Sequence, residues 1–196
     1  MTSVIDSQLR RAVLIVAGLN LAYFAVEFTV ALAIGSVSLF ADSIDFLEDT
    51  SVNLLVFLGM AWSARSRARL GMGLACVLLI PAVATLWAIW LKFSHPVPPA
   101  PLPLSLTGTG ALLVNVSCAF LLARFRNRSG SLTKAAFLSA RNDAVANVAI
   151  VATGFVTAWT GSVWPDVAVG LGIAAMNADA AREVWEAARE EFQAQA

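Results

Sequence analysis

Charged residues are scarce in this sequence. They make up 13% of its 196 residues, whereas 59% are hydrophobic and the mean hydropathy is +0.76. An ordinary soluble domain contains about 25% charged residues. A soluble core of this size could not bury so much apolar surface, so the composition excludes a soluble globular protein. The formal net charge is zero, which gives no electrostatic argument for a nucleic-acid partner.

Cysteine and histidine are almost absent as well. Cys76 and Cys118 each stand alone in an apolar run without a CxxC neighbour, so we expect packing residues rather than zinc or redox sites. The one histidine, His95, lies in a proline-rich loop from Ser94 to Pro103 and is expected to be exposed, with no ligand role. No HExxH or GxSxG motif occurs, so we expect neither an enzyme nor a resident cofactor. No cleavage site follows a short apolar core at the N-terminus, so no removable signal peptide is expected.

Long apolar runs, by contrast, are abundant. Crossing the ~30 Å hydrocarbon core of a membrane takes about 20 residues, and six runs are long enough. We therefore predict an all-α membrane protein with six transmembrane helices within residues 1–181, followed by a short helical tail over 182–196. Pro81 lies inside the third run and is expected to kink it. The runs are Ala12 to Ile34, Ser38 to Ala64, Leu70 to Leu91, Leu106 to Ala123, Ala135 to Trp159 and Val163 to Ala181.

Arginine and lysine gather in alternate loops. They precede the first run, lie between the second and third and between the fourth and fifth, and follow the sixth. The positive-inside rule then places both termini and the tail in the cytoplasm. We expect a multi-pass protein of the cell membrane, which in a bacterium is the inner membrane. The residues of this cytoplasmic set are Arg10, Arg11, Arg65, Arg67, Arg69, Arg124, Arg126, Arg128, Lys134, Arg182 and Arg189.

The second run carries four acids within eight positions. On insertion scales, one carboxylate at membrane depth costs at least about 2.5 kcal/mol, so these acids need a compensating partner. Asp45, Asp49 and Asn53 share one helical face. Asp42 is expected at the helix start or in an outer vestibule, and Glu48 is expected to pack or to form an ion pair. Because a polar stripe cannot face lipid, it must line a bundle interior or a water-filled cavity.

The fifth run carries a similar stripe. Ser139, Asp143 and Asn147 are spaced four apart and so share a face. Counting about 1.5 Å per residue from the membrane surfaces places Asp49 and Asp143 at the same depth, and Asn147 near the level of Asp45. The two stripes therefore predict one shared site between antiparallel helices.

Other polar residues in the runs have separate interpretations. Asn20 and Glu27 share a face of the first run, and Glu27 either donates a hydrogen bond while protonated or lines a cation route. Asn115 is expected to join helices through hydrogen bonds. Arg141 lies opposite the stripe of its helix and is expected to pair with another helix or extend to the cytoplasmic surface. Asp166 is expected to cap the helix that it begins.

Three carboxylates with nearby hydroxyl and amide oxygens form a hard set of ligands. Such a set suits the harder divalent cations and disfavours Cu(I). The alternative is a group of carboxyls that stay protonated or hydrogen-bonded to neighbouring helices.

These residues resemble the cation diffusion facilitator family, whose members are six-span divalent-metal/proton antiporters with both termini cytoplasmic. The resemblance covers about Asn20 to Asp179. It implies a secondary transporter that exports a divalent cation in exchange for protons. The matching segments are Gly35 to Ser43 leading into Asp45 and Asp49, Asn20 with Glu27, Asp143 to Asn147, Trp164 to Asp166, and Val169 to Ile173.

The family holds its metal with two ligands from the second span and two from the fifth. It usually has histidine or aspartate at position 139, where this chain has Ser139, a weak ligand. Water or a nearby amide would then complete the site, and without histidine zinc is not favoured over Co, Fe, Mn, Ni or Cd. The candidate ligands are Asp45, Asp49 and Asp143, with Ser139, Asn147 or Asn142 as the fourth.

Protons accompany the metal in this interpretation. Repulsion between close carboxylates favours retention of a proton until a metal replaces it. The candidate residues for the proton or the pathway are Glu27, Glu48 and Asn20. Most family members continue into a cytoplasmic metal-binding domain that helps them dimerise, so a homodimer here is expected to use membrane helices or the tail. Ser139 and the missing domain support an alternative, a non-transporting metal sensor or assembly partner on a transporter scaffold.

Overall fold

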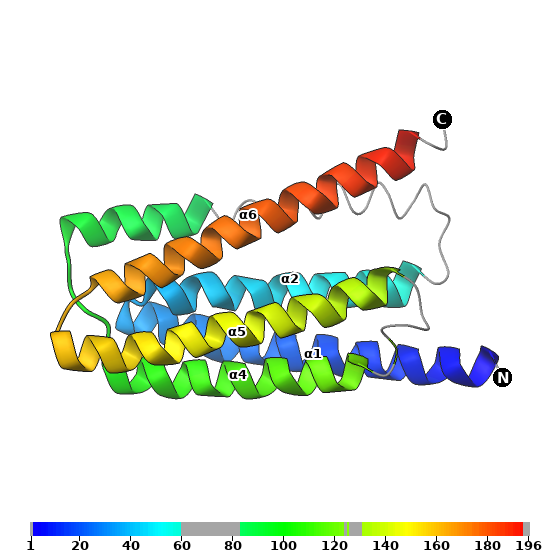
Figure 1. Cartoon of the computed structure of the whole chain (residues 1–196), viewed down its shortest axis with the longest axis horizontal. Coiled ribbons are helices and arrows are strands. Elements are labelled where there is room, and N and C mark those ends of the chain that lie inside the picture. Colours follow the sequence, from blue (N-terminus) through cyan, green and yellow to red (C-terminus); the bar gives the residue numbers. More distant parts are fainter. Residues whose placement is uncertain (1, 60–82, 124, 126–130, 194–196) are drawn as a thin grey trace.

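The computed structural model describes residues 2–59, 83–123, 125 and 131–193. Within these ranges the chain is built of helices that run along the long axis of the molecule, and both termini lie at the same end (Figure 1). We call the opposite end, which holds the α1–α2 and α5–α6 turns, the distal end. The helices are α1 (Thr2–Ile34), α2 (Val37–Gly59), a shorter apolar helix (Val83–Ser94), α4 (Pro101–Ala123), α5 (Ser131–Thr160) and α6 (Trp164–Gln193).

Among the described residues, three helices are long and apolar enough to cross a membrane by length and composition: Ser7–Ile34 within α1, Pro101–Ala123, and Ser139–Thr160 within α5. Every 18-residue stretch of α2 contains all four of its acids, which is why α2 does not qualify on composition. Helix α6 continues without a break to Gln193, so residues 182–193 of the predicted tail are helical. Most of the predicted third span lies outside the described residues, together with Pro81, Cys76, Arg65, Arg67, Arg69, Arg124, Arg126 and Arg128.

Helix α4 corrects one prediction from the sequence. The proline-rich loop was expected to extend through Pro103, but α4 already begins at Pro101. Backbone N–H groups in the first turn of a helix have no partner within that helix, so proline is tolerated there and its fixed φ suits the helix. The N–H of Leu104 donates to the carbonyl of Ala100 at 3.1 Å and closes this first turn.

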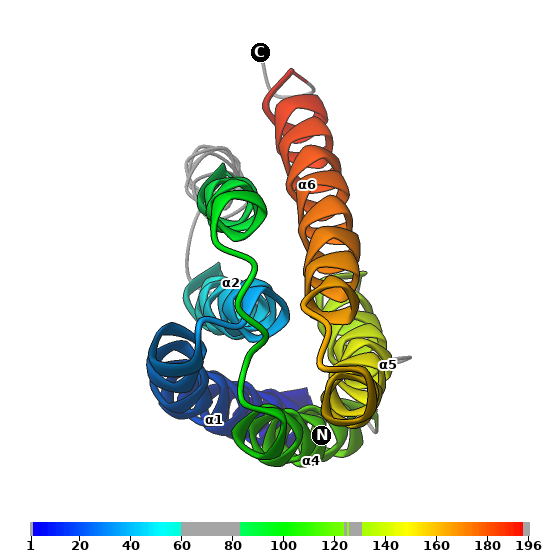
Figure 2. The same ribbon diagram turned by 90° about the vertical axis from the view of Figure 1, so that its left-hand side faces the viewer.

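Helix α2 lies at the centre of the fold. It contacts α1, α4, α5 and α6, while α4 also packs against α1 and α5. The turns into α2 and α6 pass through Gly35 (φ +64°) and Gly161 (φ +62°), in the left-handed region that favours glycine. Figure 2 shows α6 leaning away from the other helices towards its C-terminal end. The polar stripe of α2 is therefore surrounded by other helices rather than exposed.

Helices α2 and α6 approach closely near the distal end, at Gly170. A Cβ atom at this position would lie 2.6 Å from Cγ1 and 2.9 Å from the carbonyl carbon of Val37. Small residues allow such close approach between membrane helices. No atom lies within 4 Å of a Cβ placed at Gly172, one half-turn further along α6.

Gly170→Ala is therefore expected to destabilise the protein, although alanine favours a helix more than glycine does. Overpacking costs about 1–3 kcal/mol, and the thermal midpoint of the purified protein in detergent should fall. Gly172→Ala is the matched control and should leave the midpoint unchanged or raise it. Equal midpoints for the two variants would contradict the close contact.

Asp166 corrects a second prediction. It was expected to cap its own helix, but it caps α2 instead. One carboxyl oxygen accepts hydrogen bonds from Ser36 Oγ (2.7 Å), Ser38 Oγ (2.7 Å) and the Ser38 N–H (3.1 Å). The other oxygen accepts one from the Val37 N–H at 2.8 Å. Helix α6 begins instead with the Trp164 N–H on Ser162 Oγ at 3.3 Å. The carboxylate thus supplies the acceptors that the first N–H groups of α2 lack, and joins α6 to α2.

Candidate cation site

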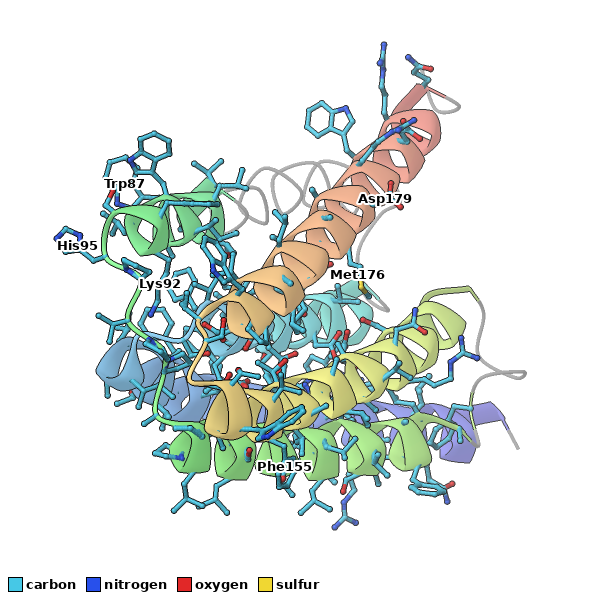
Figure 3. The ribbon with its side chains drawn as sticks, turned by 60° about the vertical axis from the view of Figure 1, so that its left-hand side comes forward. Trp87, Lys92, His95, Phe155, Met176 and Asp179 are labelled. Carbon is cyan, nitrogen blue, oxygen red and sulfur yellow. The ribbon has the colours of Figure 1, made fainter. Side chains whose placement is uncertain are left out.

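The stripe of α2 packs against the stripe of α5, and Asp49 lies at one of their contacts. Ser139 Oγ donates to Asp49 Oδ1 at 2.9 Å and lies 3.5 Å from Asp143 Oδ2. From α1, Asn20 Nδ2 donates to the other oxygen of Asp49 at 3.3 Å. Figure 3 shows side-chain oxygen atoms, in red, between the ribbons of α2 and α5. The structure therefore brings Asp49, Asp143 and Ser139 together, with Asn20 beside them.

Asp45 faces α5 between two such contacts. Seven residues along α2 and eight along α5 separate the bond of Asp49 to Ser139 from a second bond, between Asp42 and Asn147. Asp45 and Asp143 lie between these bonds, and their carboxyl groups interact electrostatically. Asp45 is buried, and its Oδ1 accepts no hydrogen bond from the described residues. A buried acceptor of this kind lacks a donor or a cation.

The second contact is about two turns nearer the distal end. Asn147 Nδ2 donates to Asp42 Oδ2 at 2.5 Å, and Asn115 Nδ2 donates to Asn147 Oδ1 at 3.0 Å. Asp42 was expected at the helix start or in an outer vestibule, but it is the sixth residue of α2 and its side chain is fully buried. Asn147 lies opposite Asp42 rather than with Asp49, and its amide oxygen is occupied by Asn115. This placement weakens Asn147 as a fourth ligand and confirms that Asn115 links two helices.

Glu27 of α1 also belongs to this cluster. Its carboxyl group lies beside that of Asp42, and the side chain is fully buried. Neither carboxyl oxygen of Glu27 accepts a hydrogen bond from a described residue. Two adjacent carboxyls therefore meet in the interior without a donor between them.

One predicted ligand, Asn142, lies apart from the site. Asn142 is exposed and accepts a hydrogen bond from Arg141 Nη2 at 3.2 Å, so the structure does not bring it to the other candidates. Its position, one residue from Asp143, turns it about 100° away from the stripe. Arg141 is exposed, in keeping with its predicted direction away from Asp143. Glu48 is half-buried, and its carboxyl group interacts electrostatically with those of Asp45, Asp49 and Asp143.

The acids of the site lack cationic partners from the described chain. None of the salt bridges between described residues involves an acid of α2 or α5, and the pair of Arg182 with Glu186 lies on an exposed part of α6. As they stand, no three Asp, Glu, His or Cys side chains of the described ranges converge closely enough to hold a metal ion. Metal binding here would therefore require Asp45, Asp49 and Asp143 to close on the ion.

The amino-acid sequence between residues 13 and 190 matches the family model described as cation efflux transmembrane domain. The match includes every residue of the cluster, from Asn20 and Glu27 in α1 to Asn147 in α5. A comparison with curated proteins found no match.

Proposed function

Because the chain belongs to the cation efflux transmembrane-domain family, we propose that this multi-pass membrane transporter exports a divalent metal cation in exchange for protons. Family membership supports a cation efflux transporter. The divalent charge, the proton exchange and the cell membrane as its location are our proposals. The observation that carries them is that Asp45 and Asp49 on α2 face Asp143 on α5 inside the bundle, while no described residue forms a salt bridge with any of the three.

The metal ligands we propose are these three aspartates, with Ser139 as the fourth. Its hydroxyl lies within reach of both Asp49 and Asp143, so an ion drawn between those carboxylates would also meet the hydroxyl oxygen. An all-oxygen set suits hard divalent cations such as Mn. The remaining candidates are Zn, Co, Fe, Ni and Cd, for which no nitrogen or sulfur ligand is offered here.

The proton site we propose is the carboxyl pair of Glu27 and Asp42. Two buried carboxylates without a donor between them repel, and one shared proton removes the repulsion and supplies a hydrogen bond. Asn20 on α1 bonds Asp49 and Asn147 on α5 bonds Asp42, so this pair and the metal ligands lie on the same three helices, α1, α2 and α5. Loading of the metal ligands and loss of the proton would thus be linked within one polar cluster.

Glu27→Gln is expected to remove the part of the metal flux that a pH gradient drives, because the amide cannot exchange a proton. Flux in proteoliposomes would be followed with and without an imposed gradient, with a pH-sensitive dye inside the vesicles. Glu186→Gln, an exposed exchange of the same kind on α6, is the control. Gradient-driven flux equal to the wild type would refute the assignment of Glu27.

Six spans with both termini in the cytoplasm complete the proposal. In that orientation the distal end faces outward. Asp166 holds α6 to α2 there, while α6 leans away at the opposite end (Figure 1). Transport would then require the contact at Asp166 to open as the other end closes, the alternating access of secondary transporters.

Ser139→His is expected to shift metal preference towards zinc, because imidazole is a stronger zinc ligand than a hydroxyl. Thermal shifts with Zn, Co, Fe, Mn and Ni would measure it, since saturation at 100 times Kd stabilises by about 2.7 kcal/mol. Ser139→Ala is the control, which removes the hydroxyl without adding a ligand. If the wild type carries no metal and the histidine variant gains zinc transport, the chain is a non-transporting protein on a degenerate scaffold.

A further inference from the structure

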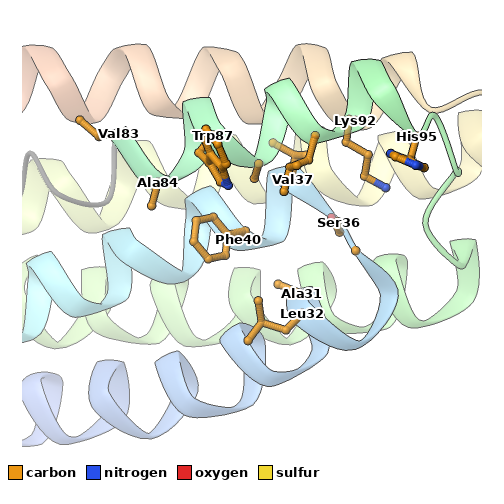
Figure 4. A pocket seen from close by; sticks show the side chains of 13 residues that line it. Ala31, Leu32, Ser36, Val37, Phe40, Val83, Ala84, Trp87, Lys92 and His95 are labelled. Carbon is orange, nitrogen blue, oxygen red and sulfur yellow. The ribbon is translucent and has the colours of Figure 1, made fainter.

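A groove of about 820 Å³ opens at the distal end, between the helix Val83–Ser94 and the ends of α1 and α2. Its volume is within the range of ~300–1,000 Å³ typical of small-molecule sites. Figure 4 shows Trp87 and Ala84 on one wall and Phe40, Ala31 and Leu32 on the other. The lining along most of its length is therefore apolar.

The groove has the depth of one membrane leaflet. Val83 and Lys92 lie at its two ends, nine residues apart on one helix, which is about 14 Å along the helix axis. Half of the ~30 Å hydrocarbon core is about 15 Å. Trp90, Phe93 and Trp164 are all at least half exposed around the Lys92 end. Aromatic residues of this kind mark the membrane–water interface, so Lys92 lies at the level of the lipid head groups.

The head-group end of the groove is cationic. Lys92 Nζ donates to the carbonyl of Val97 at 2.6 Å, which leaves two of its three N–H donors. The carboxylate of Asp166 interacts electrostatically with Lys92, but it already accepts four hydrogen bonds at the start of α2. Among the described residues Lys92 forms no salt bridge. The imidazole of His95 lies on the same side of the groove mouth (Figure 4).

We propose that this groove binds one anionic phospholipid, with an acyl chain along the apolar walls and the phosphate on Lys92 and His95. An acyl chain the length of one leaflet matches the length of the apolar walls. The negative phosphate matches the positive ammonium group of Lys92. A cation beside a leaflet-deep apolar groove fits a lipid better than the apolar helix of a second copy. The assignment does not depend on the transported ion.

Native mass spectrometry of the full chain tests the proposal, with phosphatidylglycerol and phosphatidylcholine carrying identical acyl chains. The wild type should retain one phosphatidylglycerol about fivefold more tightly than phosphatidylcholine, the effect of one lysine near a membrane surface. Lys92→Gln should abolish this preference, and Arg189→Gln, an exposed cation on α6, should keep it. Ala88→Phe fills the groove and should weaken binding of both lipids.

Two outcomes would overturn it. Equal retention of the two lipids by the wild type and by Lys92→Gln would show surrounding lipid only. A lipid-free dimer that Ala88→Phe separates would show that a second copy occupies the groove. Should Ala88→Phe fail to fold, quenching of tryptophan fluorescence by brominated acyl chains replaces it. Trp87→Phe should then remove more of the quenching than Trp185→Phe, a control far along α6, and equal losses would refute the site.

Discussion

Asp49→Ala is expected to lower metal flux in proteoliposomes by at least about 100-fold. Loss of a residue that only orients a metal ligand already costs 10–100-fold in affinity or activity, and Asp49 is proposed as a direct ligand. Its two oxygens accept from Asn20 on α1 and Ser139 on α5, so the substitution also removes the group on which three helices converge. Metal flux under a fixed gradient is the measurement.

Two further variants separate ligation from folding. Asp49→Asn keeps the shape and one acceptor oxygen but loses the charge, and should also transport poorly while it folds normally. Asp179→Ala removes an exposed aspartate on α6 (Figure 3) and should transport like the wild type. Wild-type flux in Asp49→Ala would remove this residue from the transport site and with it the proposed ligand set.

Asp166→Ala should produce the largest loss of stability, about 3 kcal/mol or more. The substitution strands two backbone N–H groups and two hydroxyls in a buried position, and each unsatisfied buried donor costs roughly 1–3 kcal/mol. The N-terminus of α2 also loses the charge that its dipole favours. Thermal or denaturant unfolding of the purified chain in detergent would measure the loss.

A graded series gives this prediction its control. Ser36→Ala removes one donor to the carboxylate and the acceptor of the Leu39 N–H but leaves the carboxylate in place, so it should cost about 1–2 kcal/mol. Asp166→Asn keeps one acceptor and should fall between the two. If Asp166→Ala were no more destabilising than Ser36→Ala, the carboxylate would not be the link between α2 and α6.

The polar faces of α2 and α5 could be predicted from the sequence because a spacing of four residues determines which side chains share a face. The position of α5 along α2 could not be predicted, and the predicted pairing of the two stripes differs from the observed one by about one turn. Asp49 was placed opposite Asp143 but bonds Ser139. Helix α5 begins at Ser131, four residues before the predicted start, because polar residues at the start of a membrane helix resemble a loop in composition.

Contacts between segments far apart in the chain could not be predicted from the sequence either. Asp166 was assigned to its own helix because a chain-local argument sees only the helix that follows. The close approach of α2 to α6 depends on Gly170, and nothing in the local sequence connects that glycine with Val37. Asn142 was included for its chemistry, although the spacing that defined the stripe already placed it on another face.

The four-residue spacing of the two stripes has a consequence for motion. A slide of α5 along α2 by one turn, about 5.4 Å, would place Asp49 opposite Asp143 and Asp45 opposite Asn147. Only Asp42 would exchange a polar neighbour for Ile150. The α2–α5 contact therefore has two registers of similar polarity, the kind of one-turn ratchet known from switching proteins. The α2–α6 contact, with Gly170 against Val37, has only one such register.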